Sequence, residues 1–386
     1  MLYYRYRSGS ELSLKELIYD ELYFASSAEC NDPYEGKVFA ILEKNQEFWN
    51  NLIRLALKYY VSDVTEYLIK KIIAFYVDKA PIYFDQFVNT SEDEFLSIGK
   101  DEVEKRLLKN MLESIKQYAF VYMPAEQYFA SFSRKPDNFL MWSHYANNHS
   151  GFCLVFRSID GKIRQSRNWK KTKLSYTTPH SFSPKMTFDI PDSFEIKDVE
   201  YVITPKYLNG FMCFPMAVTG DIYSATETEE FRTNREKIYW QKHSVWDYEE
   251  ESRVVLSSGI PWLAGERLSL SSYQRLFHYE STQLVGIIIG TKMSNEQRKK
   301  IEQIISEKVS RWYIDTEGER IISDFVLFEE KLSETNREVE IIPCKIYGGA
   351  KPISQNDKNF DKYFDEWKAG HAIKIVNNRA EKIQLL

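Results

Sequence analysis

The chain has 386 residues, of which 43% are hydrophobic, 28% charged and 15% aromatic, with a formal net charge of −5. This composition is typical of a globular protein with one large domain carrying insertions, or with two domains. The charge excludes a global attraction to nucleic acid or to an anionic membrane, and no run of about 18 apolar residues is present to cross a bilayer. The first residues, MLYYRYRSGSELS, lack the apolar core of a signal peptide, so we expect a cytoplasmic protein without a membrane partner.

Cysteine spacing supports the same compartment. The four cysteines lie far apart and never form a CxxC pair: Cys30, Cys153, Cys213 and Cys344. We therefore expect buried, reduced thiols rather than a disulfide framework or a zinc site.

The N-terminal 40 residues predict two short strands around one helix. The expected elements are a strand over 2–6, a helix over 12–20 and a strand over 22–25. The segment CNDPYEG that follows has strong turn chemistry. Asn31 and Asp32 favour an Asx-type turn there, although together with Glu35 they could instead extend an acidic pocket.

The spacing of apolar residues changes in the segment 41–120. Apolar residues recur at helical spacing in NNLIRLALKYY, VTEYLIKKIIAFYV and DEVEKRLLKNMLESIKQYAF, with few residues that break helices. This pattern predicts a helical insertion between two parts of a β-rich scaffold, and the insertion is a candidate surface for a protein partner.

From residue 126 the pattern favours strands. We expect strands over 126–134, 151–158, 199–204, 252–258 and 284–290, and helices over 230–242 and 295–309. The last 30 residues show a mixed pattern that predicts no particular element.

These elements predict an α+β fold with a mostly antiparallel core, a helical insertion and appended helices. We expect residues 1–320 to form a single α+β domain with its insertion at about 41–120, and residues 321–386 to form a C-terminal extension packed on it.

A run of three glutamates at the start of an apolar strand is the most unusual feature. In WDYEEESRVVL, residues 246–256, strand alternation would place Glu249, Glu251 and Arg253 on one face and Glu250 on the other. Arg253 is then the expected internal partner that keeps one carboxylate ionised. The alternative is an exposed ladder of charges that contributes little to stability.

A second polar segment, NFLMWSHYANNHSG, lies between two predicted strands. Trp142 and Tyr145 are three residues apart, so on a helix they would form an aromatic wall. His144 and His149 have poor spacing for a shared metal ion, and a packing role is favoured for both.

The segment GKIRQSRNWKKTK surrounds one tryptophan with basic residues. Such interleaving can bind a nucleic-acid strand, although a solvated hairpin is the more common explanation. The residues concerned are Lys162, Arg164, Arg167, Trp169, Lys170, Lys171 and Lys173.

Several short blocks together resemble a bacterial family catalogued as domain of unknown function 2971. In chain order the blocks are LYYRYRS, CNDPYEG, FASFSRKPDNFLMWSHYANNHSGFCLVF, VEYV, WDYEEESRVV and LVGIIIG. The resemblance runs from about residue 2 to 305, while the helical insertion and the tail beyond 320 are particular to this chain.

Three of these motifs also resemble the signature of ADP-ribosyltransferases, enzymes that bind NAD and cleave its nicotinamide–ribose bond. The resemblance implies a split β-sheet core. It aligns Arg5 with the first-strand cation, Ser131-Phe132-Ser133 with a serine motif that usually has threonine in the middle, and Glu249 and Glu251 with the ExE pair.

The resemblance implies roles that agree with the chemistry of glycosidic bonds. Glu251 would be the catalytic carboxylate that stabilises an oxocarbenium-like transition state, and Glu249 would position or deprotonate the acceptor. Arg5 would bind the pyrophosphate, although a cation–π contact with the aromatic residues around it is an equally good explanation. The expected NAD-binding residues are Arg5, Tyr6, Ser131, Phe132, Ser133, Trp142 and Tyr145.

The leading expectation is thus an NAD-dependent ADP-ribosyltransferase or NAD hydrolase, in a bacterial toxin or phage-defence setting, with a nucleic acid or protein as a possible acceptor. One alternative is a metal-dependent nuclease that uses Glu249, Glu251, Asp32 and Glu35. Another is a non-catalytic sensor that binds a nucleotide or a protein.

Overall fold

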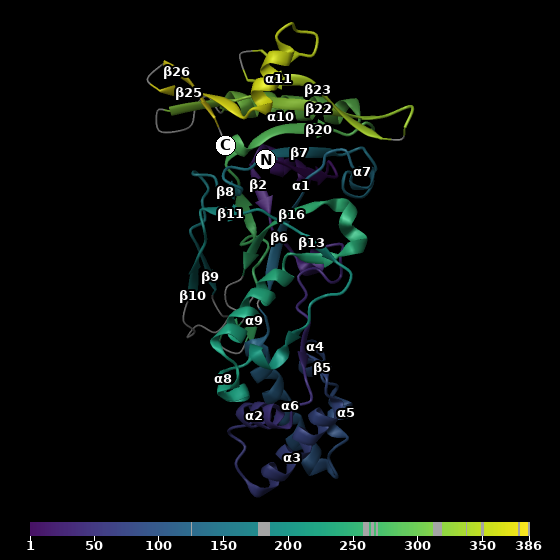
Figure 1. Ribbon diagram of the computed structural model, residues 1–386, viewed down its shortest axis with the longest axis vertical. Helices are drawn as coiled ribbons and strands as arrows, with labels where there is room; N and C mark the ends of the chain where they lie inside the picture. Colours follow the sequence, from purple (N-terminus) through teal and green to yellow (C-terminus); the bar gives the residue numbers. More distant parts are fainter. Residues whose placement is uncertain are drawn as a thin grey trace.

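The computed structural model describes the backbone of residues 1–124, 126–176, 186–257, 262–263, 266–267, 269–311, 319–336, 338–348, 351–376 and 379–384. The molecule is elongated, with a large sheet towards one end and a group of helices at the other (Figure 1). Both helices and strands are abundant and the main sheet is mostly antiparallel, which confirms the expected α+β class.

The main sheet has the strand order β12-β16-β6-β1-β7-β20-β22-β23-β24, with β3 paired to β6. Within this sheet the described strands pair antiparallel apart from β20 and β22, which are parallel. Their bounds are β1 Leu2–Arg7, β3 Ala25–Ser26, β6 Gln127–Ser133, β7 Phe152–Arg157, β12 Lys197–Asp198, β16 Glu251–Ser257, β20 Leu284–Ile289, β22 Phe325–Leu332, β23 Val339–Tyr347 and β24 Ile353–Ser354.

This sheet opens between β1 and β6. Strand β1 pairs with β7 over its whole length, but its register with β6 contains only the pair Tyr4–Ser133. Beyond that pair the two strands diverge, and the Arg5 guanidinium bridges them by donating from Nη1 to the carbonyl oxygen of Ser131 at 2.8 Å. The divergence leaves a fork in the middle of the sheet.

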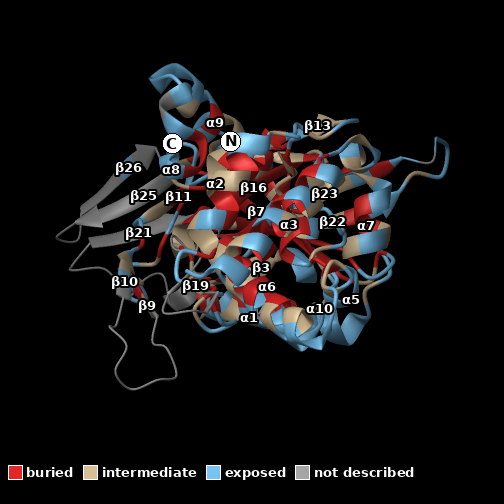
Figure 2. Cartoon of the chain, turned by 90° about the horizontal axis from the view of Figure 1, so that it is seen from below, coloured by how far each residue is buried: buried red, intermediate tan, exposed pale blue. Residues whose placement is uncertain are grey.

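Helices cover both faces of the sheet. One face packs against α1 (Glu11–Ile18) and α10 (Asn295–Arg311), and the other against α7 (Phe139–Tyr145) and α11 (Phe360–Lys368). Buried residues gather along the middle of the sheet, around β7 and β16 (Figure 2). This burial accounts for the apolar sequence FCLVF of β7, whereas β16 carries Glu251, Ser252 and Arg253 into the interior before its apolar residues.

The predicted helical insertion is present and forms a hydrophobic core of its own. Its elements are β4 Ala40–Leu42, α2 Gln46–Ala56, α3 Asp63–Lys79, β5 Ile82–Tyr83, α4 Phe84–Val88, α5 Glu92–Leu96 and α6 Glu102–Tyr122. A later part of the chain completes this core: β14 Leu208–Asn209, α8 Met216–Thr219 and α9 Ala225–Ile238. We call this unit the helical body.

The remaining strands form small pairs around the main sheet. These are β2 Glu21–Tyr23 with β19 Leu276–His278, β8 Lys162–Arg164 with β11 Ser193–Glu195, β9 Lys173–Tyr176 with β10 Met186–Asp189, β13 Glu200–Val202 with β15 Gln241–His243, β17 Trp262–Leu263 with β18 Glu266–Arg267, and β21 Glu319–Ser323 with β25 His371–Val376 and β26 Arg379–Gln384.

Two of these findings go beyond the sequence predictions. The strand expected over 199–204 shortens to β13 and pairs in parallel with β15, outside the main sheet. The C-terminal residues, whose pattern predicted no particular element, form α11, β25 and β26. Among the described helices, none is long and apolar enough to cross a membrane.

Trp49 is the centre of the helical body and provides a test of its core. Its indole is fully buried, stacks on Tyr76 with ring centroids 5.1 Å apart, and donates from Nε1 to the carbonyl oxygen of Glu43 at 3.1 Å. Trp49→Ala should lower the free energy of unfolding in urea by about 3–5 kcal/mol, because it leaves a cavity and an unpaired carbonyl. Tyr59→Ala, at a side chain that is 85% exposed, is the control; an equally small loss in both variants would contradict the packing described.

Candidate functional site

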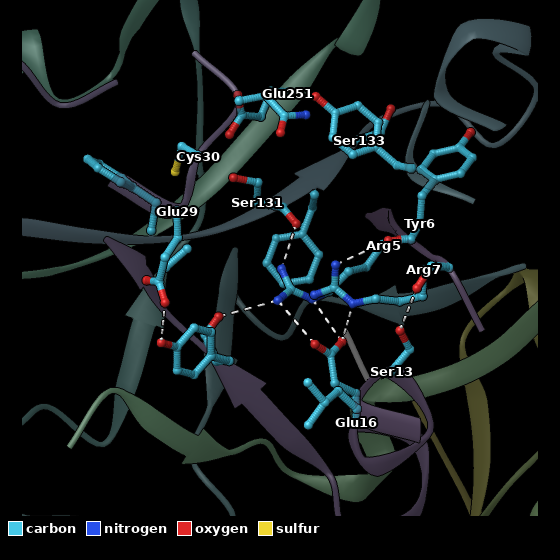
Figure 3. Close-up of a pocket in the computed structure, with 18 of the residues that line it drawn as sticks. Arg5, Tyr6, Arg7, Ser13, Glu16, Glu29, Cys30, Ser131, Ser133 and Glu251 are labelled. Carbon is cyan, nitrogen blue, oxygen red and sulfur yellow. Dashed lines mark hydrogen bonds and ion pairs between the residues drawn. The ribbon is translucent and has the colours of Figure 1, made fainter. Parts of the chain in front are cut away.

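A cavity of about 920 Å³ lies at the fork between β1 and β6 (Figure 3). This volume is within the range of about 300–1,000 Å³ that is usual for small-molecule sites. Most of the residues proposed from the sequence line it: Arg5, Tyr6, Ser131, Phe132, Ser133, Tyr145, Glu249 and Glu251.

Trp142 is not among the lining residues of this cavity. Its indole is fully buried, packs edge-on against Tyr6 at 5.2 Å, and donates from Nε1 to the carbonyl oxygen of Pro136 at 2.8 Å. Helix α7 therefore presents Met141, His144 and Tyr145 to the cavity. The expected aromatic wall contains Tyr145 without Trp142, because Trp142 projects into the core beneath the helix.

The backbone of the glutamate triplet differs from the predicted strand. Glu249 ends the 3-10 helix η4 (Ser244–Glu249), Glu250 has a left-handed backbone with φ of 42°, and Glu251 is the first residue of β16. Strand alternation was therefore the wrong explanation for the two side chains lying together, because only Glu251 belongs to the strand. The turn nevertheless directs these two carboxylates to one place, while Glu250 pairs with Lys135 at 2.6 Å.

Three buried glutamates and two buried cations form what we call the carboxylate cluster. Lys242 Nζ lies 2.6 Å from Glu249 Oε2, 3.1 Å from Glu251 Oε2 and 3.6 Å from Glu35 Oε2. Arg253 completes the cluster: it donates from Nη2 to Glu251 Oε2 at 2.8 Å and pairs through Nη1 with Glu35. The cluster carries three negative and two positive formal charges, so the cations neutralise most of its charge.

Arg253 is the internal partner of Glu251 that the sequence predicted. Its side chain is fully buried and lies over the ring of Phe129 at 5.0 Å. Its Nε is buried without a hydrogen-bond partner among the described atoms. Burying a guanidinium costs free energy unless a nearby negative charge compensates its charge. Glu251 and Glu35 provide that charge here.

The cluster drives the pKa values of two carboxyl groups in opposite directions. Burial opposes the ionisation of Glu251, but the charges of Arg253 and Lys242 and a hydrogen bond from the Ser131 side chain lower its pKa to about 2. For Glu35, burial outweighs the attraction of Arg253 and Lys242, and the neighbouring Glu251 charge adds to it, so the pKa is raised. Two carboxyl groups whose pKa values are driven apart are a pattern found in many acid–base sites.

The surroundings of Glu249 and Glu251 fix their backbone. Ser133 donates its hydroxyl to the carbonyl oxygen of Glu249 at 2.8 Å, and the Tyr201 hydroxyl accepts from the backbone N–H of Glu251 at 2.7 Å. Tyr145 donates its hydroxyl to Glu249 Oε1. The Ser133 hydroxyl is therefore engaged in a hydrogen bond to the main chain. Ser131, on the same strand, is exposed and lines the cavity.

Arg5 lies on the opposite face of the sheet from the carboxylate cluster. The pair Tyr4–Ser133 and the register of β6 with β16 place Ser131 and Glu251 on one face, so alternation along β1 directs Arg5 to the other. There Arg5 donates to Glu16 Oε2 at 3.1 Å from Nε and lies over the Phe132 ring at 5.5 Å. Arg5 thus makes a cation–π contact, but with Phe132 on β6 rather than with the tyrosines beside it in the sequence.

Arg5 also has partners that the sequence did not indicate. Its Nη2 donates to the carbonyl oxygen of Tyr23 at 3.3 Å, and Glu16 accepts in addition from Arg7 Nε at 2.6 Å. Figure 3 shows Arg5 and Arg7 converging on Glu16, with Ser131 between Arg5 and Glu251 in this view. Burial and the neighbouring Arg7 charge lower the pKa of Arg5 to about 10, which still leaves it positively charged at neutral pH.

The sequence did not predict three residues of the site, or favoured another role for them: Lys242, Glu35 and Glu16. The turn was predicted correctly for Asp32, whose Oδ1 accepts from the backbone N–H of Tyr34 at 2.9 Å. The acidic pocket that was considered less favourable than the turn is present for Glu35, because the turn directs this side chain into the carboxylate cluster. Lys242 was expected at the end of a helix over 230–242, but α9 ends at Ile238 and Lys242 lies on the three-residue strand β15.

The two other polar segments are held by internal contacts. His149 is buried, with Nδ1 at 2.5 Å from Glu330 Oε1 and Nε2 at 3.2 Å from Ser143 Oγ, in line with the packing role favoured for it. In the basic segment, Arg164 pairs with Asp160 at 3.0 Å and Lys170 with Asp192 at 2.6 Å. These pairs reduce the positive field that a nucleic-acid strand would require.

Comparison with known proteins gives one family match. Residues 141–254 match the family model described as "Protein of unknown function (DUF2971)". This segment extends from α7 to the middle of β16, so it includes Tyr145, Lys242, Glu249 and Glu251, and over it the resemblance to that family is confirmed. No curated protein and no solved structure matches the chain.

Removal of Arg253 tests the carboxylate cluster. Arg253→Met should lower the free energy of unfolding by about 3–5 kcal/mol, because buried carboxylates lose their main counter-charge. Arg54→Met is the matched control, since Arg54 makes an equivalent pair with Glu66 at 2.7 Å with both side chains 41% exposed. Exposed pairs contribute little, so this control should unfold close to the wild type in urea. Equal losses in both variants would contradict the description of the cluster.

The lowered pKa of Glu251 makes its stabilising effect depend on pH. Its pKa falls from an ordinary value of 4.5 to about 2 on folding, so its contribution is complete above pH 4.5 and is lost as the pH falls towards 2. The difference in free energy of unfolding between wild type and Glu251→Gln should therefore shrink across that interval. Denaturant titrations at a series of pH values check this, and a difference independent of pH would contradict it.

Proposed function

We propose that the cavity binds NAD and that the carboxylate cluster promotes cleavage of its nicotinamide–ribose bond, as in an ADP-ribosyltransferase or an NAD hydrolase. The observation that carries the proposal is a carboxylate, Glu251, held ionised on the wall of a cavity of about 920 Å³. Exposed Ser131 and the Tyr145 hydroxyl line the same cavity. A toxin or antiviral-defence setting remains part of the proposal.

In this proposal Glu251 stabilises positive charge on the ribose. When the C1′–N bond breaks, its electron pair leaves with nicotinamide and the ribose becomes oxocarbenium-like. A carboxylate that is already ionised and fixed by Arg253 needs no reorganisation to stabilise that charge. Because the pyridinium nitrogen of NAD departs as neutral nicotinamide, the leaving group needs no proton from the protein.

The second half of the reaction needs a base for the nucleophile, which is water or an acceptor group. Glu249 is the proposed base, with the Tyr145 hydroxyl on one oxygen and Lys242 at 2.6 Å from the other to orient it. Burial raises the pKa of Tyr145, so it stays protonated and keeps donating this hydrogen bond. Glu35, with its raised pKa, is a second proton acceptor in the cluster.

The nuclease alternative is disfavoured by the position of Lys242. Its ammonium lies among the three glutamate side chains that would otherwise bind Mg²⁺. Asp32, the fourth proposed ligand, accepts a backbone hydrogen bond within its own turn. Among the described residues, no group of three or more His, Cys, Asp or Glu side chains has an arrangement that could hold a metal ion.

The test compares neighbouring glutamates in the full-length protein. Wild type should release nicotinamide from NAD, alone or with cell extract or nucleic acid as a source of acceptor, as measured by liquid chromatography. Glu251→Gln should slow the release at least about a hundredfold, because the ionised stabiliser of the transition state is lost.

The matched control is Glu250→Gln, which removes a carboxylate that pairs instead with the exposed Lys135. It should react like the wild type, and circular dichroism should show that both variants are folded. No nicotinamide release by the wild type, or equal release by wild type and Glu251→Gln, would overturn the proposal.

A further inference from the structure

The cavity continues beyond the carboxylate cluster to a second end of different chemistry. Two of the large hydrophobic side chains that line it are strongly exposed, Leu12 at 75% and Tyr273 at 77%. They come from separate parts of the chain, the first turn of α1 and the turn before β19. An exposed aromatic ring and an exposed aliphatic side chain on one cavity wall are suited to a flat, apolar ligand group.

A series of contacts connects this end to the carboxylate cluster. Glu251 accepts a hydrogen bond from the Ser131 side chain, and the Ser131 carbonyl oxygen accepts from Arg5 at 2.8 Å. Arg5 donates onward to the carbonyl oxygen of Tyr23 at 3.3 Å, and Tyr23 is paired with Leu276 between β2 and β19. Arg5 thus lies on the wall between the two ends.

The part of the lining around Arg5 contains a positively charged group of side chains. Arg5 and Arg7 share a single carboxylate, Glu16, so the three groups together have a formal charge of +1. Lys15, which is exposed, also lines the cavity. The lining therefore contains an anionic cluster, a cationic middle around Arg5 and, beyond Tyr23, the exposed ring of Tyr273. Glu21 and Glu29 line the cavity as well.

Tyr273 is held in place although its ring is uncovered. The ammonium of Lys171 lies 4.6 Å from the centre of the ring and donates to the carbonyl oxygens of Tyr273 at 2.7 Å and Leu276 at 2.5 Å. Lys171 belongs to the basic segment noted in the sequence, and here it fixes the turn that carries Tyr273. A fixed aromatic ring loses little conformational freedom when a base stacks on it.

We propose that Tyr273 and Leu12 form a purine-binding subsite, so that the cavity is built for a dinucleotide whose reacting ribose lies at the carboxylate cluster and whose adenine lies on Tyr273. This proposal rests on the proposed function for the identity of the reacting end. The cationic middle matches the pyrophosphate that joins the two halves of such a ligand.

The experiment compares a dinucleotide with its truncated form. Nicotinamide mononucleotide contains the same glycosidic bond as NAD but lacks adenosine. In the full-length protein, Tyr273→Ala should raise KM for NAD about tenfold with kcat unchanged, and should leave KM for nicotinamide mononucleotide unaffected. Tyr273→Phe keeps the stacking surface and should behave like the wild type. An unchanged KM for NAD, or equal increases for the two substrates, would overturn the subsite.

A binding measurement separates this proposal from the proposed function. Calorimetry with ADP-ribose, which needs no bond cleavage, should show binding to wild type and about tenfold weaker binding to Tyr273→Ala. Tyr59→Ala, at an exposed tyrosine of the helical body, is the control and should bind like the wild type. If NAD is not cleaved but this pattern is found, the subsite stands and the proposed reaction fails; if ADP-ribose does not bind, the subsite fails.

Discussion

The buried ion pairs between Arg253 and two glutamates are the constraint on which the rest of the site depends. A guanidinium with no exposed surface requires compensating charge, and Glu251 on its own strand and Glu35 from a distant turn provide it. Lys242 then reduces the formal charge of the cluster, which includes Glu249, to −1. The arrangement joins three separate segments at the fork of the sheet, and it keeps one carboxylate ionised in a place that burial would otherwise make neutral.

The open register between β1 and β6 gives this cluster access to a ligand. Had the two strands stayed paired beyond Tyr4–Ser133, backbone hydrogen bonds would have filled the space that the cavity occupies. Arg5, on β1, spans the gap by donating to the carbonyl oxygen of Ser131 on β6, and it also donates to the carbonyl oxygen of Tyr23 on β2. This cation therefore has a structural role in the wall, and its charge is also available to the middle of the cavity.

Local sequence patterns predicted the elements well and the site in part. Apolar runs identified β7 and β20, whose residues are all buried, and apolar residues at helical spacing identified the helical insertion, which buries one side of its helices. The pairing of Glu249 with Glu251 was anticipated, but by strand alternation, whereas a left-handed residue, Glu250, produces it. The role of Glu35 was beyond local reasoning, since its partners Lys242 and Arg253 are more than 200 positions away. Lys242 is close in sequence to Glu249 and Glu251, but only the turn at Glu250 and the short strand β15 bring the three side chains together.

The route of the chain between the sheet and the helical body has a mechanical consequence. The chain leaves the turn of Glu35 to enter this body at β4, and it returns from the body at the end of α9, four residues before Lys242. Two members of the carboxylate cluster therefore lie beside two of the places where the chain crosses between the sheet and a separately packed unit. A displacement of the helical body relative to the sheet would act on the chain next to Glu35 and Lys242.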